Sequence, residues 1–205
     1  MKNLTVFPIF LFVVIMSALP ARAQQYQETM PDRRFIGGVV GGINLTQVDG
    51  DKLAGFNKIG FNVGGRVAAV LAPRWQLSME LLFTQLGSSR NNNDDPSATI
   101  DKIRLNAVEV PVMINFLEWK LHFSAGFSYT RLINYYVEDV FGEDITDLTD
   151  YNENLFHVVI GGTFFFTDRT GLHVNWSKSL NNLQGEPGAG TLLTRNVQVK
   201  GMYLF

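Results

Sequence analysis

The sequence predicts an all-β protein: an eight-stranded antiparallel up-and-down transmembrane β-barrel, preceded by a cleaved signal peptide. Polar and apolar residues alternate with a period of two over most of the chain, which is typical of strands and not of helices. The alternating stretches approach the roughly 9 to 11 residues with which a strand crosses a bilayer. Short turns and long polar loops follow one another in regular order, as in barrels that span an outer membrane.

The composition agrees with strands in a membrane and excludes several functions. Charged residues make up 18% of the 205 residues, below the roughly 25% of soluble domains. The formal net charge of −2 provides no basic field for nucleic acid. The chain has no cysteine, which excludes disulfides, thiolate metal sites and a cysteine nucleophile.

The first 23 residues are expected to be a secretory signal peptide. Lys2 provides the positive charge, an apolar run follows, and the small-x-small site Ala21–Ala23 predicts cleavage before Gln24. A membrane-anchor helix is the alternative, but the apolar run is short and is bracketed by Pro8 and Pro20. The predicted organisation is a signal peptide at 1–23, a lead-in at 24–33 and a barrel domain at 34–205.

Eight stretches alternate and are the expected strands. They cover residues 34–45, 60–71, 75–83, 106–116, 121–135, 156–166, 172–176 and 196–205. Tight turns are expected at 72–74, 118–120 and 167–170. Long polar loops are expected at 45–58, 88–101, 137–153 and 182–192. The short turns and both ends of the barrel then lie on one side of the membrane, and the long loops lie on the other.

The two faces of these strands predict which side meets lipid. An outer-membrane barrel turns its apolar face outward and fills its interior with small and polar side chains. Charged and histidine side chains fall on the polar face, among Gly, Ser and Asn: Arg66, Glu80, Glu109, His122 and Lys200. The core of a soluble β-sandwich would not hold such a set, which favours the barrel over the sandwich.

Arg66, Glu80 and Glu109 come from three neighbouring strands and form the candidate site in the lumen. A polar or proton-relay site is one interpretation. A structural ion pair that fixes the strand register is favoured, because eight strands leave an interior just filled by side chains and buried carboxylates need partners. On this interpretation Arg66 is the cation for both carboxylates, and its replacement by alanine lowers the stability of the barrel.

The last strand alternates up to a final aromatic residue. A closed barrel needs its last strand to pair with its first, because a lipid-exposed sheet edge is not tolerated. Tyr203 and Phe205 resemble the C-terminal signal that the barrel-assembly machinery reads in outer-membrane proteins. Aromatic belts are expected at both membrane interfaces. The short-turn belt comprises Trp75, Phe116, Trp119, Tyr203 and Phe205, and the long-loop belt comprises Tyr129, Tyr135 and Tyr136.

The remaining candidate sites have structural explanations. His122, His157 and His173 are expected to fill the lumen and not to bind zinc. Pro111 lacks a backbone donor and predicts a bulge or bend in its strand. The acidic loop 138–153 could take calcium or a partner, but its spacing does not match an EF-hand and a solvated loop is favoured. No nucleophile with a base and no phosphate-binding glycine loop is recognisable, so that no enzyme, catalytic residue, cofactor or metal is predicted.

Three stretches, in order along the chain, resemble one family. They are "GGVVGGINL" at the start of the domain, "ELLFTQLGSS" in the third strand and "VEVPVMINF" in the fourth. They are similar to the PorT-like outer-membrane β-barrel family of Bacteroidota-type bacteria, from about Phe35 to Phe205. The family often has an aromatic residue before "LEIP", where this chain reads "NAVEVP". The resemblance implies an eight-stranded outer-membrane barrel. PorT itself is linked to a secretion system, but a shared fold does not carry that role over.

Together these observations predict an integral outer-membrane barrel without catalysis. Its expected work is structural or interactive: partner binding through the outer loops, or an accessory role in export or envelope integrity. The expected partners are outer-membrane lipid, the barrel-assembly machinery and an envelope or secretion-system protein, and no nucleic acid. A pore is not expected, because eight strands leave no aqueous channel. A small lipid-modifying enzyme and a secreted soluble barrel that binds a small ligand are the alternatives.

Overall fold

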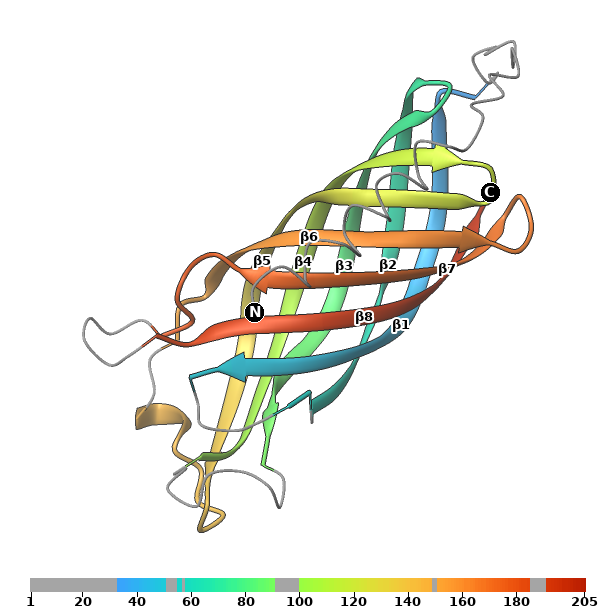
Figure 1. Ribbon diagram of the computed structural model, residues 1–205. Helices are drawn as coiled ribbons and strands as arrows, with labels where there is room; N and C mark the ends of the chain where they lie inside the picture. The colour runs from blue at the N-terminus through green and yellow to red at the C-terminus, as the bar shows by residue number, and fades with distance from the viewer. Residues whose placement is uncertain (1–32, 51–54, 57, 91–99, 149–150, 185–190) are drawn as a thin grey trace, which may run out of the picture.

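The computed structural model describes residues 33–50, 55–56, 58–90, 100–148, 151–184 and 191–205. Within these residues, eight antiparallel strands form a closed barrel in chain order (Figure 1). The strands are β1 (Phe35–Asp49), β2 (Lys58–Ala72), β3 (Trp75–Ser89), β4 (Ile100–Glu118), β5 (Leu121–Asp139), β6 (Asn154–Phe165), β7 (Thr170–Ser179) and β8 (Leu193–Leu204). A short 3₁₀ helix, η1 (Thr146–Leu148), follows β5. Among the described residues, no helix is long and apolar enough to cross a membrane. The predicted signal peptide and nearly all of the lead-in lie outside them.

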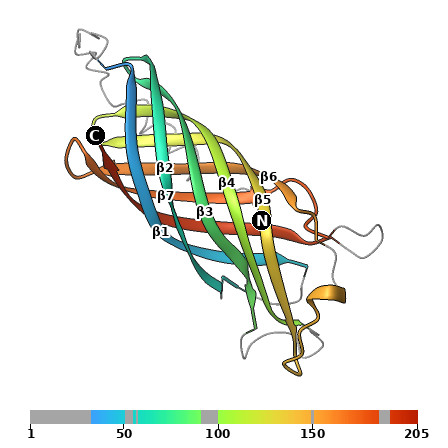
Figure 2. The same ribbon diagram turned by 180° about the vertical axis from the view of Figure 1, so that it is seen from behind.

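The connections alternate in length as predicted, and the predicted fold class is confirmed. Residues 73–74, 119–120 and 166–169 make the short turns at one end of the barrel, and the four longer connections emerge at the other end (Figures 1 and 2). Most strands are longer than the alternation predicts. β4 and β5 have 19 residues each, and they extend farthest at the long-loop end (Figure 1).

Burial along each strand is the reverse of that in a soluble protein. In β3, Leu81 is 61% exposed, whereas Glu80 beside it is 1% exposed. Successive side chains of a strand point to opposite faces, so this contrast separates an apolar outer wall from a polar interior. A protein in water would bury the leucine and leave the glutamate exposed. The outer wall is therefore the surface that meets lipid.

The barrel closes where β1 pairs with β8, from Gly38 opposite Leu204 to Asp49 opposite Leu193. The Phe205 amide extends this pairing by donating a hydrogen bond of 3.0 Å to the Gly37 carbonyl oxygen. A side chain on β1 at position 42 would collide with the Val199 carbonyl oxygen, so that only glycine permits this approach of the two backbones. Closure leaves no lipid-exposed edge.

One β-bulge changes which side chains point inward. The pairing of β4 with β5 shifts by one residue between Asn106 and Ala107, which leaves Ile133 on β5 as the extra residue. Alternation reverses beyond the bulge. Tyr135 consequently packs against Tyr151 inside the barrel, with ring centroids 5.1 Å apart. Its predicted place in the long-loop belt is therefore wrong, and Tyr136 takes the outward position.

Pro111 does not create the predicted bulge. Its strand keeps one register with β3 on both sides of the proline, from Met79 opposite Val112 to Leu82 opposite Glu109. The two pairs between these are missing from that ladder. The proline therefore removes backbone pairing with β3 locally, but it does not shift the register of the two strands.

The interior is mainly polar along its length, but its long-loop end also holds a large apolar part. The apolar part is a cluster of buried side chains that we call the apolar plug. It consists of Val48, Leu86, Ile103, Leu105, Ala107, Leu132, Val137, Tyr151, Leu155, Leu183 and Leu192. The prediction of a polar interior throughout is wrong at this end, because strand ends and loop residues fold over the barrel and bury their apolar side chains together.

Candidate functional site

A buried charge network centres on Glu80 in β3. Its Oε1 accepts a hydrogen bond from Arg66 Nη1 on β2 at 2.7 Å. Its Oε2 accepts one from Lys200 Nζ on β8 at 2.6 Å. Lys200 is 0% exposed, so its ammonium group depends on protein atoms for stabilisation. One carboxylate is thus shared by two cations, which come from two different strands.

Glu109 in β4 has different partners. Its Oε1 accepts a hydrogen bond from Ser128 Oγ and its Oε2 accepts one from Gln198 Nε2, both at 2.9 Å. The structure therefore brings Arg66 and Glu80 together, but it places Glu109 against neutral donors from β5 and β8. The two carboxylates do not share Arg66.

Lys200 is the functional residue of the network that sequence reasoning did not connect. Period-two alternation placed it on the inward face of the last strand. Nothing in that pattern gives its depth relative to Glu80, which lies 120 residues away along the chain. The closing register of β8 on β1 sets this depth.

Side-chain hydrogen bonds continue the network toward the short turns. Arg66 Nη2 lies 3.5 Å from Asn115 Oδ1, and Ser124 Oγ donates to the same oxygen at 2.7 Å. Asn115 Nδ2 donates to Ser78 Oγ at 2.8 Å. These contacts join β2, β3, β4 and β5 across the lumen, so that each polar group supports the orientation of the next.

The three histidines lie on the inner wall but do not converge. His157 Nε2 lies 2.9 Å from Thr194 Oγ1, and His173 Nδ1 lies 2.8 Å from Thr163 Oγ1. His122 instead stacks on Phe165, with ring centroids 4.6 Å apart. In the part of the chain that the structure describes, no group of three or more His, Asp or Glu side chains is arranged to hold a metal ion.

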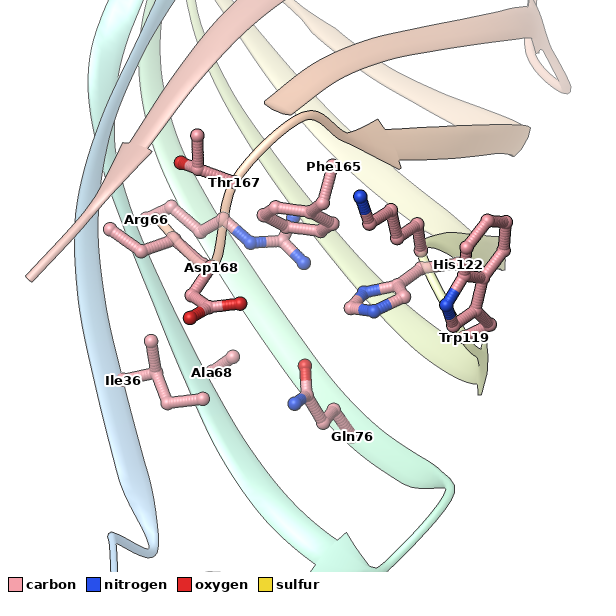
Figure 3. A pocket seen from close by; sticks show the side chains of 11 residues that line it. Ile36, Arg66, Ala68, Gln76, Trp119, His122, Phe165, Thr167 and Asp168 are labelled. Carbon is pink, nitrogen blue, oxygen red and sulfur yellow. The ribbon is translucent and has the colours of Figure 1, made fainter. Parts of the chain in front are cut away.

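A cavity of about 280 Å³ opens below the charge network, at the short-turn end (Figure 3). Its lining includes Arg66 of the charge network, Gln76 close to the β2–β3 turn, and the turn residues Trp119, Lys120 and Asp168. Both signs of charge are present among the lining residues. The cavity does not continue through the barrel, because the Glu80 network and the side chains above it are buried.

Aromatic side chains mark both ends of the outer wall. Trp75 and Phe116 stack near the short turns, with ring centroids 5.1 Å apart, and Trp119 in the next turn is 84% exposed. Toward the long loops, Tyr129 stacks on Phe156 at 5.4 Å. This distribution is that of interfacial aromatic belts.

In the acidic loop after β5, the carboxylates of Asp139 and Asp144 accept hydrogen bonds from nearby residues of the same loop. Asp139 Oδ1 accepts hydrogen bonds from the amides of Phe141 and Glu143, at 2.8 and 2.9 Å. Asp144 Oδ1 accepts hydrogen bonds from the hydroxyl and the amide of Thr146. These bonds hold the pKa of Asp144 below its ordinary value. Calcium binding by this loop stays a hypothesis.

Comparison with known proteins agrees with this architecture. The family described as "Outer membrane protein beta-barrel domain" matches residues 23–185. The solved structure of Ail, the attachment invasion locus protein of Yersinia pestis, is similar with a TM-score of 0.51 and 14% identity, over 84% of this chain and 100% of that one. Neisserial surface protein A (NspA) gives a TM-score of 0.49 and 11% identity, over 84% of this chain and 98% of that one. No curated protein matches the sequence. At 14% identity, the similarity to Ail is evidence for a shared fold alone. The chain belongs to the outer membrane protein β-barrel domain family, as an integral protein of the outer membrane.

Proposed function

We propose that this protein is a sealed, non-conducting outer-membrane barrel that works by binding partners at its long-loop end. The observation that carries the proposal is burial in the lumen. Ile103 and Leu105 of the apolar plug are 0% exposed, and so is Lys200 at the level of the charge network. A water-filled channel would leave the side chains along its wall exposed.

The two closed levels differ in chemistry and lie one above the other. The apolar plug excludes ions because an ion would lose its hydration there without gaining a partner. The charge network excludes them because each of its charged groups already has a partner within the protein. An ion that crossed the barrel would have to disrupt both.

The long-loop end supplies the surface for interaction. β4 and β5 continue past the apolar band of the outer wall, at the end of the barrel from which the four longer connections emerge (Figure 1). We assign the protein to the PorT-like kind of barrel on its sequence motifs. An envelope or secretion-system protein is the partner class that this assignment favours, in an accessory role in export or envelope integrity.

The function is non-catalytic in this proposal. The hydroxyl of Thr194 lies beside His157, as a nucleophile would lie beside its base, but both residues are buried in the filled lumen. A substrate cannot reach either atom, and geometry is the first requirement of a catalytic pair. Export by the signal peptide and recognition of Tyr203 and Phe205 by the barrel-assembly machinery belong to the same proposal.

Conductance across a planar lipid bilayer tests the sealed barrel. The mature protein is refolded, its folded state is verified by a heat-dependent shift of its gel band, and a general porin serves as the positive control. We expect no stepwise current after insertion. Reproducible current steps from the folded protein would overturn the proposal and assign it a transport role.

A further inference from the structure

The apolar band of the outer wall ends at one level on β3 and β4. The last apolar outward residues are Phe83 on β3 and Val108 on β4. Two positions nearer the long loops, the outward residues are Gln85 and Asn106, and Arg104 follows on β4. The wall therefore changes from apolar to polar within one pleat, at the depth where a bilayer changes from acyl chains to headgroups.

Three basic side chains gather just beyond this boundary. Lys58 at the start of β2 lines a cavity of about 310 Å³ together with Arg104. Lys102 lies two positions beyond Arg104 on β4, and therefore on the same outward face of that strand. The complete lining of the cavity is Lys58, Gln85, Leu86, Arg104, Leu105 and Asn106. We call Lys58, Lys102 and Arg104 the basic patch.

Two other basic residues at this end have acidic partners, whereas the basic patch forms no ion pair with any described residue. Arg131 binds Glu153 at 2.8 Å, and Arg195 binds Asp49 at 2.6 Å. Glu138 lies opposite Lys102 in the β4–β5 register, yet no ion pair forms between them. Three like charges that have no counterion among the described residues repel one another and favour the binding of an anion.

Fixed amide groups stand beside the basic patch. Gln85 Nε2 donates to Asn106 Oδ1 at 3.1 Å, and Asn106 Nδ2 donates to Asn134 Oδ1 at 2.7 Å. This ladder across β3, β4 and β5 holds neutral donors in a defined orientation below the cations. Cations with additional N–H donors are the groups that bind phosphate oxygens most strongly.

We propose that the basic patch binds the phosphate groups of a lipid headgroup in the membrane leaflet that faces the long loops. The position at the edge of the apolar band selects a lipid over a soluble anion, because the acyl chains of the same molecule then lie against Phe83 and Val108. Basic pockets on membrane proteins at headgroup depth recognise anionic lipids in this way.

Native mass spectrometry of the mature, folded protein in detergent tests the site. The probe is lipid A with two phosphates, and phosphatidylcholine is the comparison lipid. In the test variant, Lys58→Gln, Lys102→Gln and Arg104→Gln are combined. The matched control combines Arg33→Gln, Arg34→Gln and Arg74→Gln, which removes the same charge from exposed positions at the short-turn end.

We expect the wild-type and control proteins to bind lipid A in preference to phosphatidylcholine. The test variant should bind lipid A about a hundredfold more weakly, since each basic residue near an anionic headgroup contributes about a factor of five. Equal binding by all three proteins, or equal binding of the two lipids by the wild type, would overturn the proposal. Displacement of lipid A by an equal concentration of inorganic phosphate would show a soluble-anion site and also overturn it.

Folding of the test variant is verified by the heat-dependent shift of its gel band. If it fails to fold, the single substitution Arg104→Gln replaces it, because Arg104 is exposed. That variant should lose about a factor of five in affinity for lipid A. Unchanged affinity in the folded single variant would contradict the assignment.

Discussion

Replacing Glu80 with glutamine would test the charge network that joins opposite walls of the barrel. The substitution keeps the size of the side chain but removes the negative charge between Arg66 and Lys200, which lie 2.7 and 2.6 Å from its oxygens. Two buried cations then lose their counterion. We expect the free energy of unfolding to fall markedly, with the shape of the lumen unchanged.

The magnitude follows from the number of partners that are lost. Removing one member of a buried ion pair costs about 3 to 5 kcal/mol, and Glu80→Gln removes the member that two cations share, so about 5 kcal/mol is expected. Lys200→Met leaves Glu80 paired with Arg66. Its cost should be near that of one charged hydrogen bond, about 1.5 to 3 kcal/mol.

Urea unfolding in lipid vesicles, followed by tryptophan fluorescence, measures both variants. Arg74→Gln is the control, because Arg74 forms an ion pair with Glu118 in which both side chains are about half exposed. Exposed pairs contribute less than about 1 kcal/mol. The reasoning would be refuted if Glu80→Gln cost no more than the control, or less than Lys200→Met.

Three further predictions concern the wall, the loop and the last residue. Gly64→Ala should sharply reduce the yield of folded barrel on gels, because its Cβ would collide with a backbone oxygen of β3. Gly65→Ala should fold normally, because its Cβ would make only an ordinary contact of 3.9 Å with the Gly38 carbonyl oxygen, and equal yields would contradict this. Thr146→Val should raise the pKa of Asp144 toward its ordinary value, because it removes the hydroxyl group whose hydrogen bond stabilises the charged carboxylate. NMR titration of the Asp144 carboxyl group measures this change, and an unchanged pKa would refute that cause. Phe205→Ala should lower the fraction of folded barrel in outer membranes, because the ring packs against β1, and an unaltered fraction would remove its assigned role.

The pairing of Arg66 with Glu80 could be predicted because a tight turn fixes the register of a hairpin. Both residues lie seven positions or fewer from the turn at 73–74, and the structure places them directly opposite one another. β3 and β4 are joined by a long loop, which leaves their register free. Glu109 accordingly lies opposite Leu82 and not opposite Glu80. The short turn therefore determines the pairing of Arg66 with Glu80, whereas the closure of the whole barrel determines the position of Glu109.

Most of the apolar plug was not predictable from alternation, because all its members except Ala107 and Leu132 come from segments that were assigned to loops or lie beyond the predicted strand ends. Val48 and Leu183 fall in stretches whose overall composition is polar. Ile103 and Leu105 precede the predicted start of their strand. The bulge at Ile133 reverses the alternation within one strand, and a sequence pattern of period two does not mark the position of such a reversal.

The position of Lys200 on the closing strand has a consequence for the order of assembly. Until β8 pairs with β1, Glu80 has one cation and Lys200 has no counterion, so that the open sheet carries an unmatched charge on its inner face. A slip of two residues in the final pairing keeps every side chain on its correct face, but it moves the ammonium group by about 7 Å along the strand and away from the carboxylate. Correct closure and the pairing of Lys200 with Glu80 are therefore the same event, and a slipped register is disfavoured because it leaves the buried ammonium group without this partner.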